Sequence, residues 1–175
     1  MVKQKNNNLV YLFLRYLLIV LLGLGNLFIF YKIFTPLTIY PVYFLLSLFS
    51  SAMLLDKIII FNGSVIQLIP ACIAGAAYYL LVILILSTPN IKTSKRIIVI
   101  LFSILSLLIL NILRIFFLAL LTNSVYFDSV HMIFWYALST IFVVGIWMLA
   151  VKIFNIASVP VYSDLKYLLK LIRKK

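Results

Sequence analysis

Residues 56–72 read D-K-I-I-I-F-N-G-S-V-I-Q-L-I-P-A-C. β-Branched residues lie on both sides of Asn62-Gly63, and Asn-Gly between two such runs is the strongest short signal for a β-hairpin, because both residues tolerate a positive φ. Pro70 suits the first position of a helix, where its missing N–H costs little. The stretch therefore predicts a small hairpin that leads into a helix carrying Cys72, the only cysteine of the chain.

The rest of the sequence is strongly apolar. Hydrophobic residues make up 66% of the 175 residues and charged residues only 10%, and the mean hydropathy is +1.26. A soluble domain of this size cannot bury so much apolar surface, and the apolar runs are too long for the strands of a membrane barrel. The composition predicts an all-α integral membrane protein, with a single multi-pass domain over residues 1–175.

The apolar residues form runs that are each long enough for one membrane crossing of about 20 residues. We expect five transmembrane helices, at roughly 9–30, 37–55 (with Pro41 in its first turn), 70–87, 97–121 and 129–153. The first run is longer than the apolar core of a signal peptide, so we expect it to be retained. Open sheet edges cannot face lipid, so the hairpin before the third helix is expected at the interface or against the bundle.

The charge balance orients the helices. The chain has fifteen Lys and Arg and three Asp, for a net charge of +12. The basic residues lie at the ends of apolar runs. This placement indicates a role in orienting the helices and in binding anionic lipids, and not in binding nucleic acid. The loop at 92–96 and the basic tail at 153–175 are expected in the cytoplasm, and the hairpin outside. Five crossings would then put Lys3 and Lys5 outside, against the positive-inside rule. Either the basic residues of the loop and the tail outweigh these two charges, which we favour, or the second helix does not cross the membrane fully.

Metal and disulfide chemistry are not expected. A single cysteine excludes an intramolecular disulfide, and no Cys or His residues are paired at the spacing of a metal site. The sequence therefore predicts no metal and no cofactor.

Two polar residues stand out in the third and fourth helices. Cys72 is expected in a first turn, where the helix dipole stabilises a thiolate, although a lone cysteine usually packs as a small hydrophobe. Arg114 has apolar neighbours for two turns on either side, and a cation there costs at least about 2.5 kcal/mol on insertion scales, which favours a functional role. The alternative is a snorkelling anchor. Asn111 lies on the same helix face as Arg114.

A third polar residue begins the last helix. His131 is the only histidine and follows Asp128, the expected N-cap, so it should lie in a first turn, where the dipole keeps the imidazole neutral. Trp135 is one turn further on, and the alternative role is an interfacial histidine beside an aromatic belt. Cys72, Arg114 and His131 all fall at a similar, outer depth. Together they supply the nucleophile, the charge stabiliser and the base of a cysteine acyl-transfer site.

This pattern resembles the exosortase/archaeosortase family of membrane cysteine transpeptidases. The matching features are an extended hairpin that leads into A-C-x-x-G at 71–75, N-x-x-R at 111–114, and His131 opening the next helix. The resemblance covers about residues 57–152, the expected catalytic core. The chain looks like a minimal member, because most members have more spans, and Ile73 stands where members often have Ser or Thr beside the cysteine.

The resemblance implies a protein-sorting enzyme of the cell membrane whose active site faces outside. It would cleave secreted proteins at a C-terminal signal of motif, membrane helix and basic tail, and join the new C-terminus to a lipid or other envelope amine. Cys72 would form the thioester, His131 would be the general acid and base, and Arg114 would orient groups or stabilise charge, with Asn111 in support. The small residues at 71 and 74–77 would let a helix approach closely, either the substrate's or the fourth or fifth helix of the chain itself.

Two other functions remain open. The first is a non-enzymatic membrane protein, such as a small assembly factor or transporter subunit, in which Arg114 binds an anionic lipid or a partner. The second is a channel or carrier, which is disfavoured because the polar residues collect at one end instead of spreading through the bilayer.

Overall fold

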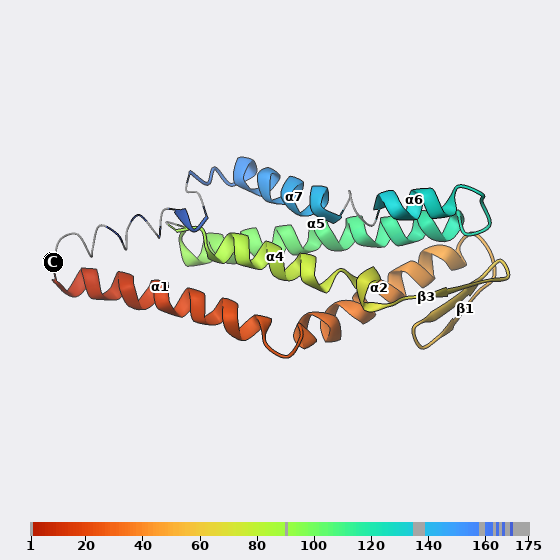
Figure 1. The fold of residues 1–175 in the computed structure, drawn as a ribbon, viewed down its shortest axis with the longest axis horizontal. Helices are drawn as coiled ribbons and strands as arrows, with labels where there is room; N and C mark the ends of the chain where they lie inside the picture. The colour runs from red at the N-terminus through yellow and green to blue at the C-terminus, as the bar shows by residue number, and fades with distance from the viewer. Residues whose placement is uncertain are drawn as a thin grey trace.

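The computed structural model describes residues 2–89, 91–134, 139–157, 160–162, 164, 166 and 169. This part of the chain is mostly helical, with one small sheet, and it is elongated (Figure 1). The helices are α1 Val2–Gly23, α2 Phe28–Ser47, α3 Pro70–Ile73, α4 Gly75–Leu86, α5 Thr93–Leu120, α6 Phe127–Ile133 and α7 Ser139–Ile153. The strands are β1 Ala52–Leu55, β2 Ile58–Phe61 and β3 Ser64–Gln67. The sheet and α6 lie at one end, which we call the sheet end, and the start of α1 lies at the other.

Two helices, α2 and α5, are long and apolar enough to cross a membrane. Three shorter apolar helical stretches accompany them, at Val10–Gly23, Pro70–Leu86 and Thr140–Ile153. By length and composition, α2 and α5 point to a membrane protein. The expected five crossings are taken up again with the proposed function.

The expected bounds of the first two helices are wrong. α1 ends at Gly23 and α2 begins at Phe28, because Gly25, Asn26 and Leu27 between them all adopt a positive φ of 53° to 66°, which a right-handed helix cannot continue. α2 then ends at Ser47 and holds both of its prolines in its interior, so Pro41 is not in a first turn.

α1 and α2 run end to end in the same direction (Figure 1). Tyr11 accepts a hydrogen bond from Arg96, near the start of α5, and further along α1 the carbonyl of Ile19 accepts one from Tyr79. At the far end of α2, Leu46 packs in a cluster with residues of the sheet. Residues 2–47 therefore traverse the molecule once. The lengthwise passes of the described chain are α1 with α2, α3 with α4, α5, and α6 with α7, which differs from five alternating helices.

A buried polar cluster ties α1 to the tail at the end opposite the sheet. Arg15 forms a salt bridge with Asp164, and Tyr16 donates a hydrogen bond to the same carboxylate at 3.1 Å. Arg96 was expected in the short loop at 92–96; instead it lies in α5, is 4% exposed, and donates to the carbonyl of Thr88 at 2.7 Å. The start of α1 and this part of the tail therefore lie at the same end of the molecule.

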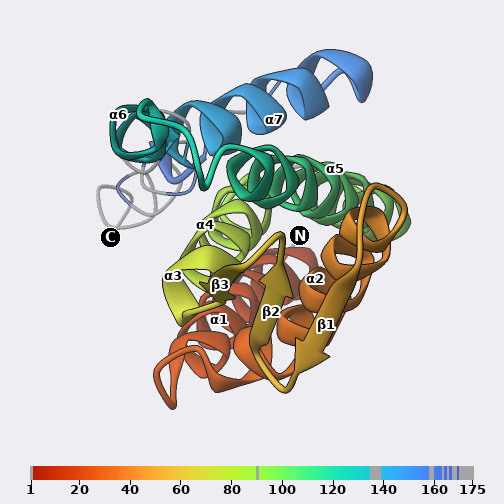
Figure 2. The ribbon, with the colours of Figure 1, turned by 90° about the vertical axis from the view of Figure 1, so that its right-hand side faces the viewer.

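The predicted hairpin is present, and a third strand joins it. Asn62 and Gly63 form the two-residue turn with φ of 49° and 77°, and Phe61 pairs with Ser64 across it. β1, which the sequence analysis placed at the end of the second membrane helix, pairs antiparallel with β2 through a turn in which Asp56 has a φ of 54°. The sheet order is β1-β2-β3, so β3 is an edge strand (Figure 2).

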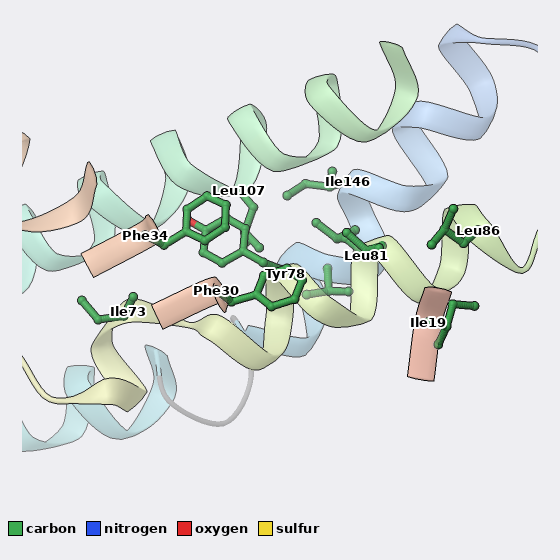
Figure 3. Packing of buried hydrophobic residues seen from close by; sticks show 11 residues of the cluster. Ile19, Phe30, Phe34, Ile73, Tyr78, Leu81, Leu86, Leu107 and Ile146 are labelled. Carbon is green, nitrogen blue, oxygen red and sulfur yellow. The ribbon is translucent and has the colours of Figure 1, made fainter. Parts of the chain in front are cut away.

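The main hydrophobic core lies between the helices. The ring of Tyr78 in α4 stacks on that of Phe34 in α2, with centroids 3.7 Å apart and planes at 4°. Leu107 from α5 and Ile146 from α7 close the same cluster (Figure 3). A second cluster joins the end of α2, the sheet and the last turns of α5. The sheet is thus fixed to the helix bundle by side-chain packing.

The small residues around Cys72 allow a close helix contact within the chain. A Cβ added at Gly75 would lie 2.7 Å from the ring of Tyr31 in α2, so only glycine fits at this distance. The helix that contacts Gly75 is therefore α2. It is not the expected fourth or fifth helix, at 97–121 or 129–153. The expectation of close approach is met here by the chain itself.

Candidate functional site

A cavity of about 240 Å³ lies at the sheet end of the molecule. Its walls come from β3 and the residues that follow it, from the last turns of α5, and from α6 with the loop before it. Cys72, Arg114 and His131 all line this cavity. The structure thus brings together the three residues that the sequence places at one depth. The remaining lining residues are Val65, Ile66, Gln67, Leu68, Ile69, Ile115, Leu118, Ala119, Thr122, Phe127 and Phe134.

The helix that carries Cys72 is a single turn. α3 ends at Ile73, and Ala74 adopts the left-handed conformation with φ 60° and ψ 33° before α4 begins at Gly75. The expectation of one continuous helix from Pro70 is therefore wrong, because Ala74 adopts a conformation that alanine seldom takes. A four-residue helix also has almost no aligned peptide dipoles, so the dipole argument for a thiolate at Cys72 no longer applies.

Asn111 and Arg114 bind the backbone exposed by this break. The side-chain amide of Asn111 donates to the carbonyl oxygens of Cys72 at 2.9 Å and of Ile73 at 3.5 Å. Nη2 of Arg114 donates to the carbonyl of Cys72 at 3.4 Å. These carbonyls lose their helical partners where α3 stops, and side-chain donors satisfy them. Nη2 of Arg114 is thus directed at the backbone of Cys72.

Arg114 keeps hydrogen-bonding capacity that the described chain does not use. Its Nε is buried and has no hydrogen-bond partner among the described residues, and the same holds for the hydroxyl of Tyr78. Sequence reasoning missed Tyr78, whose only signal is a phenol in an apolar run one to two turns beyond Cys72. A cationic donor thus lies beside the cavity.

His131 reaches the cavity from α6. Its ring stacks on that of Phe127, with centroids 5.4 Å apart and planes at 21°. The expected N-cap is wrong, because Tyr126 occupies that position, no side chain caps the helix, and Asp128 lies inside the first turn. His131 is in the last turn of this short helix, so the dipole argument for a neutral imidazole does not hold either. Trp135 lies outside the described residues.

The lining set has the residue types that acyl transfer uses. It combines one thiol, one imidazole and one guanidinium with mostly apolar walls, and no carboxylate is among the residues that line it. Among the described residues, no group of three His, Cys, Asp or Glu side chains could hold a metal ion. A nucleophile, a base and a charge stabiliser in one small apolar cavity are the parts of a covalent acyl-transfer site.

Comparisons with protein-family models, with curated proteins and with solved structures return no match for this chain.

Proposed function

We propose that this chain is a membrane-embedded cysteine transpeptidase or protease of the exosortase/archaeosortase type. The observation that carries the proposal is that Cys72, Arg114 and His131, from three different helices, line one cavity. The substrates would be secreted proteins that end in a short motif, an apolar helix and a basic tail. Their new C-terminus would pass to an envelope acceptor such as a lipid amine, or to water.

The proposed reaction has two balanced halves. The thiol of Cys72 gives its proton to His131 and attacks the scissile carbonyl carbon, and Arg114 stabilises the oxyanion that forms. The C–N bond then breaks, the leaving amine takes the proton from His131, and a thioester remains. In the second half an amine or water gives a proton to His131 and attacks the thioester. The C–S bond breaks, and the thiolate recovers the proton.

Asn111 acts as a positioning residue in this scheme. It is 2% exposed and binds the carbonyl of Cys72, so it fixes the backbone from which the thiol extends. Because Asn111 and Arg114 lie three residues apart in α5, one rigid helix orients both the nucleophile and the group that stabilises charge.

The proposed membrane topology follows the lengthwise passes of the chain. Five alternating helices would place Lys3 and Lys5 outside, against the positive-inside rule. The end-to-end run of α1 and α2 favours four crossings, with both ends of the described chain in the cytoplasm and the cavity at the outer face. Under this topology Lys3 and Lys5 lie in the cytoplasm, as the positive-inside rule expects, and Lys57, between β1 and β2, lies on the outer side. Cysteine scanning with a membrane-impermeant maleimide would test it, since Lys3→Cys and Lys166→Cys should be protected in intact cells and Asn123→Cys should react.

The test of the function is processing of a substrate in cells. Secreted proteins of the same organism that carry the three-part C-terminal signal are co-expressed with the chain, and cleavage is followed by the change in their mass. Cys72→Ala and Cys72→Ser should abolish processing, and Arg114→Ala should lower its rate by about 10²- to 10³-fold, as for the loss of an oxyanion donor. Normal processing by Cys72→Ala would exclude the proposal.

A non-enzymatic role has one observation in its favour. The hydrogen bonds of Asn111 and Arg114 end on the backbone of Cys72 and Ile73, as they would if both residues only closed the broken helix. For an assembly factor of this kind, Arg114→Ala should impair assembly of the partner complex, whereas Cys72→Ala should have no effect. The two variants therefore separate the two functions.

A further inference from the structure

β3 exposes unpaired backbone groups beside the thiol. It is the edge strand of the sheet, and Val65 to Ile69 line the cavity together with Cys72. The edge of a strand presents a row of N–H and C=O groups on which another chain can pair.

The register shows which residues face this edge. Leu68 N donates to the carbonyl of Lys57 at 2.9 Å, continuing the ladder in which Ile66 pairs with Ile59. In an antiparallel ladder the hydrogen-bonded pairs alternate, so Leu68 and Ile66 bond toward β2. Val65 and Gln67 therefore direct their N–H and C=O groups to the free edge. Among the described residues, no hydrogen bond found outside the sheet ladder involves the backbone of either residue.

The strand edge selects an extended ligand. An extended chain presents its N–H and C=O groups to a neighbouring strand about 4.8 Å away. A helix has already used most of these groups in its own hydrogen bonds. The charge of the lining adds a second condition. Arg114 lines the cavity and no carboxylate does, so a segment with Lys or Arg is repelled.

We propose that an extended peptide segment without Lys or Arg binds as a fourth strand on the free edge of β3. It pairs with the backbone of Val65 and Gln67 and so brings its carbonyl to Cys72. Strand addition of this kind takes affinity from main-chain hydrogen bonds. This inference rests on the proposed function, since it names the form in which that substrate enters.

The experiment measures how fast Cys72 of the full chain in detergent is alkylated. The probe is the chloromethyl ketone of acetyl-tetra-alanine, and its partner is the same peptide with the inner amides N-methylated, which cannot complete the ladder. The wild type should react at least tenfold faster with the first reagent. Iodoacetamide, which has no peptide backbone, reports the intrinsic reactivity of the thiol.

The matched variants act on single backbone donors. Val65→Pro and Gln67→Pro remove N–H groups that face the free edge, where proline is tolerated, and should bring the ratio of the two peptide rates close to one. Their iodoacetamide rates should stay within about twofold of wild type, because this reagent forms no ladder with the strand edge. Val65→Ala and Gln67→Ala keep the donors and should keep the ratio. Ile66→Pro removes a donor to β2 and should unfold the sheet.

Two outcomes would overturn the inference: a ratio near one in the wild type, or an unchanged ratio in both proline variants. These results are separate from the test of the function. If Cys72→Ala abolishes sorting while the wild-type ratio is one, only strand addition fails. If the ratio behaves as expected while Cys72→Ala still sorts, the peptide site stands and the enzymatic proposal fails.

Discussion

The side-chain amide of Asn111 donates a hydrogen bond at 2.9 Å to the backbone carbonyl of Cys72, a residue 39 positions earlier. The bond connects the middle of the longest helix to the end of the shortest one. Because α3 is a single turn followed by a left-handed residue, its own hydrogen bonds cannot fix its end. The position of the thiol therefore depends on α5.

Asn111→Ala should destabilise the protein. The substitution leaves the buried carbonyls of Cys72 and Ile73 without their amide donor, which costs about 1–3 kcal/mol. The change is measured as a lower melting temperature in detergent. Ser103→Ala is the matched control on the same helix, because Ser103 is 0% exposed and its hydroxyl has no partner among the described residues. Its melting temperature should stay the same or rise, and a loss as large as that of Asn111→Ala would contradict this assignment.

Ala74→Gly should stabilise the protein by about 1 kcal/mol. Ala74 has a φ of 60°, which costs an L-residue about 1–2 kcal/mol and costs glycine almost nothing. Ala76→Gly, two residues later and exposed in α4, should instead lose about 1 kcal/mol, because glycine is a poor helix former. The two substitutions should thus shift the melting temperature in opposite directions, and shifts of the same sign would show that the break at Ala74 is not formed.

Gly75→Ala should lower stability through the contact with Tyr31. The new Cβ would lie 2.7 Å from the tyrosine ring, and overpacking of this kind costs about 1–3 kcal/mol. Gly145→Ala in α7 is the control, since nothing lies within 4 Å of its added Cβ. Combining Gly75→Ala with Tyr31→Leu should recover most of the loss. Additive losses in that double variant would mean that the two residues do not touch.

Asp164→Asn should detach the tail from α1. Asp164 and Arg15 are 8% and 6% exposed at their side chains, and removal of one charge of a buried pair costs about 3–5 kcal/mol because the other remains unpaired. Hydrogen exchange of the amides around residue 164 should therefore increase, together with a lower melting temperature. Asp128→Asn, at an exposed position of α6, should change neither quantity, and an equal effect of both substitutions would argue against the salt bridge.

The hairpin could be predicted because its signal is local. Asn62-Gly63 requires the positive φ values that the structure has, and the flanking residues favour strands. β1 gave no such signal, since Ala52–Leu55 continues the apolar run of α2 with only serines as interruptions. The same continuity hid the end of α1, where glycine, asparagine and leucine turn the chain inside one long apolar stretch. Hydropathy thus locates apolar segments but does not show where the backbone bends.

The residues of the site could be predicted, but not their roles in the fold. Cys72, Arg114 and His131 are rare residue types in an apolar chain. Arg114 carries a free-energy cost of insertion into the membrane, and Cys72 and His131 have chemically reactive side chains. Neither Cys72 nor His131 lies in the first turn of a long helix, as the sequence predicted, because the break at Ala74 and the shortness of α6 depend on packing between distant segments. Arg15 was missed for a related reason, since its partner Asp164 is 149 positions away.

α5 carries an arginine near each end. Arg96 lies in its first turn and Arg114 near its end, and the intervening eighteen or so residues span about 27 Å at 1.5 Å per residue. This length is close to the roughly 30 Å hydrocarbon thickness of a bilayer. If α5 crosses the membrane as proposed, its length sets the distance along the membrane normal between the thiol of Cys72 and the contact of Arg96 with Tyr11 of α1. Bilayer thickness would then decide which peptide bond of a membrane-anchored substrate stands level with Cys72.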